Sequence, residues 1–418
     1  MSYRPDYHIT PKKGWINDPN GFVFFNGEYH LYAQHNPYDT VWGPMHWLHF
    51  VSRDLHNWTE KGIALKPSAP YDKEFGCFSG SSIVKDDKLF VLYTGANGDK
   101  QVQCLAVSKD GYNFEKYPYN PVLDEDDLPD GYLVKDFRDP KIIFQNDTYY
   151  VLLAARHKDG YSSILLYKSK DLIHYEFVNV LKSFNNMAEN GMVECPDVVF
   201  ENGKACLIYS FQHPINYEKD FTVCSQVGHI DLDKGVFVPT GEEKELEQGF
   251  VGYASHTLTK DKHNYYISWL HSWGINSPTA KEGYVGVLSL VKTLHIHNDY
   301  LRFNFLLDNP NTYLYEGYLT DDIAEINLSN IKIILEKNTG IVTLLRKDMD
   351  VEIKNEKGKI LSSKQIKLKD LSRITLEVCI DKSIIELLFN KGEAFAGIDN
   401  YIQDCDSYRI SVKGINLE

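Results

Sequence analysis

DTYYVLLAA, at residues 147–155, is one of five similar stretches that decide the fold of this chain. Each stretch begins with a turn-like dipeptide and continues as an alternating strand rich in aromatic and β-branched residues. Successive copies begin 56 to 60 residues apart. The other four are GEYHLYAQH at 27–35, DKLFVLYTG at 87–95, GKACLIYSF at 203–211 and HNYYISWLH at 263–271. A repeat of this length, with several short strands and no sustained helical period, is typical of a propeller blade.

A second string recurs 21 to 25 residues after the start of the first three copies. It reads SRDLHNWTE at 52–60, SKDGYNFEK at 108–116 and SKDLIHYEF at 169–177. Each version places an Asp in a polar turn before an aromatic residue, as expected of a tight connection into an outer strand. The two patterns together predict a five-bladed β-propeller over residues 1–305. A β-sandwich or barrel with coincidental spacing is the alternative.

The repeat ends near a turn-rich segment, and a different strand pattern follows it. We predict an interdomain connection over residues 306–322. Alternation then resumes in RITLEVCID at 373–381 and SIIELLFN at 383–390. This pattern predicts a C-terminal β-sandwich over residues 323–418. The chain is therefore expected to be all-β, with a catalytic propeller and a packing domain.

The composition narrows the classes of partner. A formal net charge of −14 argues against nucleic acid and against anionic membrane surfaces, whereas a neutral small molecule is compatible with it. The N-terminus lacks the apolar stretch of a signal peptide, and no run reaches membrane-spanning length. The seven cysteines are scattered without CxxC pairs, which indicates free thiols in a cytoplasmic protein and no zinc site. Edge strands of the sandwich leave a homo-oligomer possible.

Three carboxylates occupy similar places in three of the repeats. Counting back eight or nine residues from each repeated turn reaches Asp18, Ser79, Asp139, Glu194 and Ser255. In a ring of repeated units, equivalent positions lie at equivalent heights around one axis. Two Asp and one Glu should therefore converge on a single site.

Such a set of acids permits metal binding or glycoside hydrolysis. Oxygen ligands suit calcium or magnesium, but EF-hand spacing is absent and Asn17 and Arg138 adjoin two of the acids. Glycoside hydrolysis needs a carboxylate and a carboxylic acid that flank the scissile bond. Glu194 is the expected acid, because partial desolvation beside Cys195 and Pro196 favours its protonated form.

The other two acids are expected to stay charged. Asp18 lies in a polar turn whose donors can hold it ionised, so it is the expected nucleophile. Asp139 follows Arg138 and should accept hydrogen bonds from sugar hydroxyls. Aromatic side chains near the predicted strand ends would stack on sugar rings. These are Trp15, Trp42, Trp47, Phe78 and Trp273.

At these residues the chain resembles the invertase and fructanase family, glycoside hydrolase family 32. The motifs are GWINDPNG at 14–21, FSGSS at 78–82, FRDP at 137–140 and ECPD at 194–197. The resemblance implies retaining hydrolysis of β-fructofuranosides without an essential metal or cofactor. It makes Asp18 the nucleophile, Glu194 the acid/base and Asp139 the stabiliser of the transition state. It also implies a fructose subsite lined by Asn17, Gln34, Trp42, Ser79 and Arg138.

Two positions depart from the family pattern. Val193 stands where the family usually has Trp, and Val291-Lys292 replaces a common Pro-Arg pair. The expected substrates are sucrose, sucrose 6-phosphate or short fructo-oligosaccharides, and Lys281 is a candidate phosphate contact. Fructosyl transfer through the same covalent intermediate is an alternative, as is a non-catalytic sugar-binding propeller.

Overall fold

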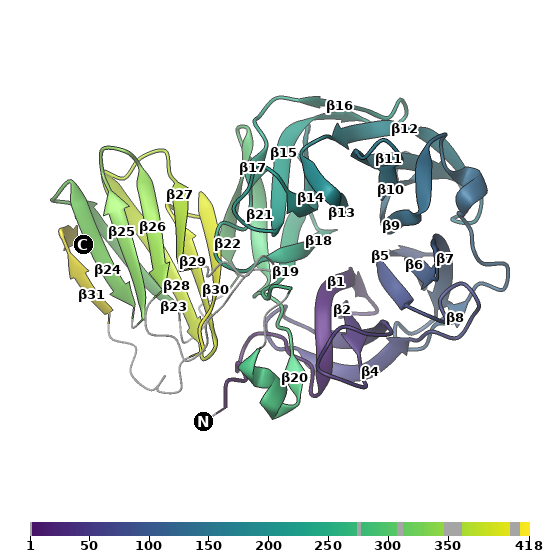
Figure 1. Cartoon of the computed structure of the whole chain (residues 1–418), viewed down its shortest axis with the longest axis horizontal. Helices are drawn as coiled ribbons and strands as arrows, with labels where there is room; N and C mark the ends of the chain where they lie inside the picture. The colour runs from purple at the N-terminus through teal and green to yellow at the C-terminus, as the bar shows by residue number, and fades with distance from the viewer. Residues whose placement is uncertain (1, 274–276, 307–311, 329, 347–361, 402–409) are drawn as a thin grey trace.

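In a computed structural model of the chain, the described residues are 2–273, 277–306, 312–328, 330–346, 362–401 and 410–418 (Figure 1). Strands dominate these residues, and the helices among them are two short 3₁₀ turns, η1 (Glu125–Asp127) and η2 (Pro278–Glu282). No described helix has the length and hydropathy needed to cross a membrane.

The described strands before residue 306 form five sheets. The first sheet contains β20 (Tyr284–Val285), β1 (Gly14–Phe25), β2 (Glu28–Asn36), β3 (His46–Ser52) and β4 (Thr59–Leu65). The second contains β5 (Gly76–Lys85), β6 (Lys88–Asn97), β7 (Lys100–Ser108) and β8 (Glu115–Lys116). The third contains β9 (Tyr132–Gln145), β10 (Thr148–His157), β11 (Ser162–Ser169) and β12 (Tyr175–Phe184). The fourth contains β13 (Met187–Glu201), β14 (Lys204–Pro214), β15 (Phe221–Asp231), β16 (Val236–Pro239) and β17 (Lys244–Glu245). The fifth contains β18 (Tyr253–Lys260), β19 (His263–Trp269), β21 (Lys292–His297) and β22 (Tyr300–Phe305).

These sheets surround a common centre, with their first strands innermost (Figure 1). β1, β5, β9, β13 and β18 contact one another in succession, and β18 returns to β1. β20 also pairs in parallel with β1, which fastens a segment after the fifth sheet onto the first. The predicted propeller is therefore confirmed.

The five repeated stretches of sequence form the second strand of each sheet: β2, β6, β10, β14 and β19. A two-residue turn joins each of them to the innermost strand, and both turn residues have φ between 49° and 81°. Such turns match the natural twist of a hairpin, and they favour Asn, Asp and Gly. The turns are Asn26-Gly27, Asp86-Asp87, Asn146-Asp147, Asn202-Gly203 and Asp261-Lys262.

The second repeated string forms a side-chain-stabilised turn in three sheets. The Asp54 carboxylate accepts hydrogen bonds from the backbone N–H groups of His56 and Asn57, at 2.9 and 2.7 Å. Asp110 and Asp171 do the same in the next two sheets. Burial by itself raises the pKa of Asp54, but hydrogen bonds from Asn57 outweigh it and hold that pKa below its usual range. The Ser-x-Asp string is therefore a structural device.

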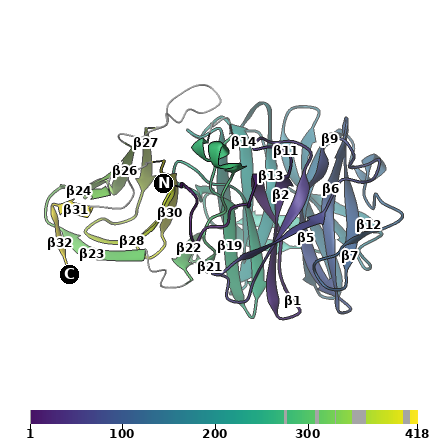
Figure 2. The same cartoon turned by 90° about the horizontal axis from the view of Figure 1, so that it is seen from below.

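The remaining strands form the predicted sandwich of two sheets beside the propeller (Figures 1 and 2). One sheet contains β30 (Ala394–Asp399), β29 (Ile384–Phe389), β28 (Arg373–Asp381), β23 (Thr312–Leu319) and β32 (Ile415–Leu417). The other contains β27 (Ser363–Lys367), β26 (Ile341–Arg346), β25 (Ile331–Glu336), β24 (Ile323–Leu328) and β31 (Ile410–Lys413). Leu, Ile and Val side chains from both sheets form one buried core. Strand β23 lies inside the predicted connection 306–322 and belongs to the sandwich, and the exact domain limits stay a prediction.

A buried group of charges joins the two domains, and we call it the interface cluster: His8, Lys292, Asp381 and Glu386. His8 precedes β1 and contacts Asp381 Oδ2 and Glu386 Oε1, both at 2.8 Å. Lys292, at the start of β21, pairs with the other oxygen of Glu386. All four side chains are buried. The sandwich is thus held against both the N-terminal segment and the fifth sheet.

Candidate active site

Each innermost propeller strand has an irregularity in register at the same level. At this point the inner strand takes three steps between two paired residues while its partner takes only two. The inner strand therefore contains one extra residue, which defines a β-bulge. The paired residues on either side are Ile16 and Pro19, Cys77 and Gly80, Arg138 and Lys141, Glu194 and Asp197, and Tyr253 and His256. A bulge redirects side chains, and five at one level direct them to the centre of the ring.

The backbone at this level is strained in three consecutive sheets. Asp139, Cys195 and Ala254 have φ values of 62°, 47° and 50°, in the left-handed region that residues other than glycine rarely adopt. Each such residue costs on the order of 1–3 kcal/mol, and this strain persists only where the surrounding structure enforces it. The fold therefore loses some stability in order to form the backbone at the level of the bulges.

The expected equivalence of the five counted positions is correct for four of them and shifted for one. Asp18, Ser79, Asp139 and Ser255 lie inside the bulges. Glu194 instead pairs with Ser210 immediately before its bulge, and Cys195 occupies the bulge. The extra residue of a bulge alters the count, so equal spacing in the sequence does not assign this position.

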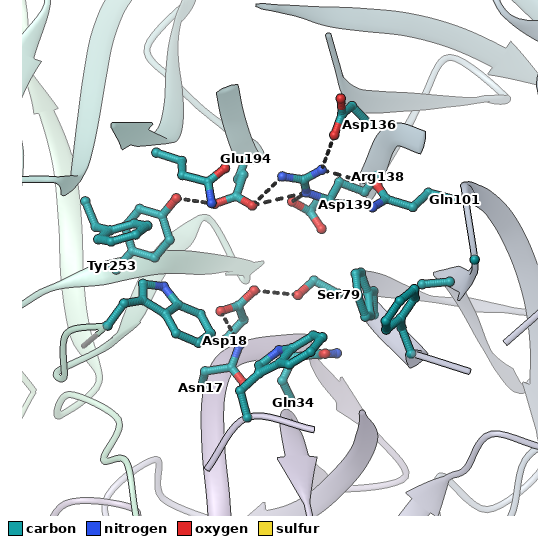
Figure 3. Close-up of a pocket in the computed structure, with 18 residues that line it drawn as sticks. Asn17, Asp18, Gln34, Ser79, Gln101, Asp136, Arg138, Asp139, Glu194 and Tyr253 are labelled. Carbon is teal, nitrogen blue, oxygen red and sulfur yellow. Dashed lines mark hydrogen bonds and ion pairs between the residues drawn. The ribbon is translucent and has the colours of Figure 1, made fainter. Parts of the chain in front are cut away.

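A cavity of about 490 Å³ opens at this level, and its wall contains ten of the predicted site residues (Figure 3). They are Asn17, Asp18, Gln34, Trp42, Phe78, Ser79, Arg138, Asp139, Glu194 and Trp273. Ser255 does not line it; it is buried and lies on a smaller cavity together with residues of the other four innermost strands. The three acids, from three separate sheets, thus share one cavity.

Asp18 is held by two donors. Asn17 Nδ2 donates to Oδ1 at 2.8 Å, and Ser79 Oγ donates to Oδ2 at 2.6 Å. Burial nevertheless raises the pKa of Asp18 to about 6; the Ser79 hydrogen bond opposes this rise and the charge of Glu194 adds to it. The donors expected in the turn are present, and burial makes the carboxylate more basic than that turn alone would.

Asp139 is tied to the backbone of the next sheet. Its Oδ2 accepts a hydrogen bond from Cys195 N at 2.9 Å, and Cys195 Sγ lies 3.7 Å from both this oxygen and Asp18 Oδ2. Burial raises the pKa of Asp139 well above its ordinary value, against the opposing charge of Arg138. Arg138 lowers this pKa in the predicted direction, but its guanidinium approaches Asp139 only to 4.0 Å and donates to Glu194 instead, so the effect of burial is larger.

Glu194 is clamped between two neighbours (Figure 3). Arg138 donates to Oε1 through Nη2 at 2.6 Å and Nε at 3.1 Å, and Tyr253 Oη donates to Oε2. Arg138, Glu194 and Tyr253 each pair immediately before the bulge of three successive sheets. Tyr253 was missed from the sequence, because the position of the bulge is visible only in the folded structure.

Two polar residues at the Arg138 end of the cavity were also missed. Arg138 Nη1 donates to Gln101 Oε1 at 3.2 Å and lies 3.6 Å from Asp136 Oδ1. Gln101 comes from β7, whose sequence has no chemical motif, so only the fold brings it here. Asp136 directly precedes the FRDP motif, so its place in the sequence could have pointed to it.

The aromatic predictions divide into wall residues and supports. Trp42, 40% exposed, lies edge-on to Phe78 with ring centroids 6.1 Å apart, and both line the cavity. Trp273 lines it from another sheet and stacks on Trp15 at 5.6 Å. Trp15 and Trp47 are buried outside the lining, so the expectation that they contact sugar is wrong. They support the site, because Trp15 Nε1 donates to Asn17 and Trp47 Nε1 to the Phe78 carbonyl.

The residues that depart from the family pattern, and the candidate phosphate contact Lys281, lie outside the cavity. Val193 and Val291 are buried in the core, and Lys292 belongs to the interface cluster. Lys281 lies exposed on η2 and is not part of the wall, so the structure gives it no contact with the site. Within the described ranges, no group of three or more His, Cys, Asp or Glu side chains has an arrangement that could hold a metal ion.

Comparison with known proteins connects this site to one family. The model described as "Glycosyl hydrolases family 32 N-terminal domain" matches residues 8–305. A sucrose-6-phosphate hydrolase of Zymomonas mobilis is 30% identical, over 92% of this chain and 83% of that protein. A raffinose invertase of Escherichia coli is 29% identical, over 98% and 92%.

Solved structures of two related proteins align with this structure over nearly the whole chain. The sucrose-6-phosphate hydrolase of Lactobacillus gasseri has a TM-score of 0.87 at 26% identity, covering 99% of this chain and 92% of that one. A family 32 β-fructofuranosidase of Bombyx mori has a TM-score of 0.84 at 29% identity, with the same coverage, and a variant of it was solved in complex with sucrose.

Proposed function

The chain belongs to glycoside hydrolase family 32, and from this premise we propose that it hydrolyses terminal β-D-fructofuranosides of the sucrose type with retention of configuration. The observation that carries the proposal is the convergence of Asp18, Asp139 and Glu194 on one cavity. Its ligand is a small sugar, and the aromatic wall suits the apolar faces of sugar rings.

The first step is the displacement of the leaving sugar by Asp18. Its carboxylate attacks the anomeric carbon of the fructosyl unit and forms a covalent ester. Glu194 protonates the glycosidic oxygen at the same time, so the leaving sugar departs as a neutral alcohol. The hydrogen bonds from Asn17 and Ser79 fix the attacking oxygens, which reduces the entropic cost of alignment.

The second step is hydrolysis of that ester. Glu194, now ionised, removes a proton from water, and the resulting hydroxide attacks the anomeric carbon and releases Asp18. Arg138 donates to one oxygen of Glu194 and Tyr253 donates to the other, so the side chain keeps one position through both steps. Asp139 accepts hydrogen bonds from fructose hydroxyls, and these strengthen as positive charge develops on the ring.

A substrate panel with stereochemical analysis tests the proposal. We expect release of fructose from sucrose, raffinose and kestose, with β-fructofuranose as the first anomer seen by NMR during rapid turnover. Initial release of the α-anomer would exclude the covalent route. Absence of fructose release from every member of the panel would exclude the proposed function.

Fructosyl transfer is the second candidate, because an acceptor sugar can replace water at the ester. Chromatography of products at high sucrose concentration separates the two outcomes: glucose and fructose in equal amounts indicate hydrolysis, and an excess of glucose with new trisaccharides indicates transfer. The cytosol is the proposed compartment, in agreement with the free state of the six described cysteines. Cell fractionation tests this location.

A further inference from the structure

The charges that line the cavity are strongly unbalanced. Asp18, Asp136, Asp139 and Glu194 contribute carboxylates, whereas Arg138 is the one Lys, Arg or His among the described lining residues. The neighbouring Arg156 pairs with Asp136 Oδ2 at 3.7 Å but does not line the wall.

The positive charge of Arg138 is already shared between two carboxylates. Nε and Nη2 both donate to Glu194, and Nη1 donates to Gln101 and lies near Asp136. A bound phosphate normally needs a free guanidinium or ammonium group, or the N-terminus of a helix. The described lining offers no free cation, and neither 3₁₀ turn contributes a residue to it.

We infer that this cavity selects sugars with an uncharged leaving group and discriminates against sucrose phosphorylated on the glucose 6-hydroxyl. The inference rests on the proposed function and narrows its substrate class. It also separates this chain from the relatives that are named sucrose-6-phosphate hydrolases. A phosphate dianion placed here would lose hydration and meet carboxylates without compensation, whereas a neutral glucosyl group would meet hydrogen-bond partners and aromatic faces.

Asp136 is the acid on which this selectivity depends most directly. It lies at the Arg138 end of the wall, and the proposed chemistry does not use it (Figure 3). Its carboxylate therefore lowers the affinity for anionic leaving groups without a role at the anomeric carbon.

The test compares kcat/KM for sucrose and sucrose 6-phosphate in the same full-length protein. We expect sucrose to be preferred by roughly tenfold or more, and the preference to shrink as ionic strength rises, because salt screens repulsion between charges. Asp136→Asn should raise the ratio of the phosphorylated to the plain sugar. Asp322→Asn, which makes the same change of net charge on the exposed surface of the sandwich, should leave the ratio unchanged.

Equal or better use of sucrose 6-phosphate by the unaltered protein would overturn the inference, and so would an unchanged ratio in Asp136→Asn. Hydrolysis of neither sugar, together with no fructose release from raffinose or kestose, would instead exclude the proposed function. Calorimetric binding of the two sugars to that protein would then test the charge argument separately. Tighter binding of the plain sugar would support it, and tighter binding of the phosphorylated sugar would contradict it.

Discussion

Two clusters of buried charge in this chain differ in their balance, and the difference separates stability from chemistry. The interface cluster contains two cations and two anions in direct contact. The catalytic cluster contains Asp18, Asp139 and Glu194 against Arg138 alone, at the wall of a cavity. Balanced charges in a closed space hold domains together, and surplus carboxylates in an open one supply reactive groups.

In the interface cluster the pKa shifts favour the charged forms of the side chains, whereas in the catalytic cluster the shift of Asp18 favours its neutral form. In the interface cluster, burial lowers the pKa of His8, but the hydrogen bonds that His8 donates to Asp381 and Glu386 outweigh this and raise it to about 9. The same contacts lower the pKa of Asp381 to about 2 against the effect of burial. In the catalytic cluster, burial raises the pKa of Asp18 to about 6. The fold thus favours charge at the interface and disfavours it where catalysis occurs.

Removal of the nucleophile or the acid should have the largest effect. Asp18→Asn or Glu194→Gln should lower kcat by at least about 10³-fold, because the covalent ester or the leaving-group proton is lost. The midpoint of thermal unfolding should not fall for Asp18→Asn, since this change relieves repulsion with Glu194. Near-normal turnover in either variant would remove that residue from the proposed mechanism. A large drop in the unfolding midpoint of Asp18→Asn would contradict the conclusion that the catalytic cluster does not stabilise the fold.

Asp139→Asn should reduce kcat more than it raises KM. A carboxylate that binds fructose hydroxyls more strongly as the oxocarbenium ion develops stabilises the transition state over the ground state. We expect a loss of roughly 10²-fold in kcat, measured by steady-state kinetics on sucrose. A change limited to KM would make Asp139 a simple binding residue.

Glu386→Gln should affect stability and spare activity. It leaves the buried charge of Lys292 without its carboxylate partner and His8 with Asp381 alone, which costs about 3–5 kcal/mol of unfolding free energy. Glu316→Gln is the matched control, because its pair with Arg373 is half exposed and contributes less than about 1 kcal/mol. Urea unfolding measures both variants, and kcat at 25 °C should match the unaltered protein. Equal stability of the two variants would show that burial does not strengthen the interface cluster.

The sequence predicted what repeats and missed what only the assembled fold brings together. Alternation and turn residues gave the strands, because each blade is built from local hairpins. Tyr253 and Gln101 are ordinary strand residues that become site residues when the ring closes. Trp15 and Trp47 show the reverse, since composition cannot distinguish an aromatic wall from the layer that supports it.

The interface cluster illustrates the same limit over a longer range. His8, Lys292 and Asp381 are far apart in the chain and carry no motif, and the sandwich was predicted only to be a packing domain. Lys292 attracted attention as a departure from the family pattern, yet its role is an ion pair with the sandwich. Pairing between domains leaves no periodic signal in either of them.

Stability should decline from neutral to alkaline pH because of His8. Its pKa is raised on folding from 6.5 to about 9, so its contribution is complete below pH 6.5 and is lost as the pH rises through 9. The shift corresponds to about 3 kcal/mol. Urea unfolding at intervals between pH 6 and 9.5 measures this loss. His8→Gln should show a flatter profile in the same window, and an equally steep one would assign the decline to another group.

The smallest expected effect is on the acidic side of the pH profile of kcat/KM. Asp18 must be ionised to attack, so the rate should fall below about pH 6 instead of near the ordinary Asp value of 3.8. Ser79→Ala removes a hydrogen bond that stabilises the charged carboxylate, so the acidic side of the profile should move to higher pH, by less than about one unit. Ser82→Ala is the control, because Ser82 Oγ donates to the Gly21 carbonyl and does not line the cavity. A fall of the rate near pH 4 in the unaltered protein would mean that burial does not govern Asp18, and the contrast between the two clusters would then fail at its catalytic end.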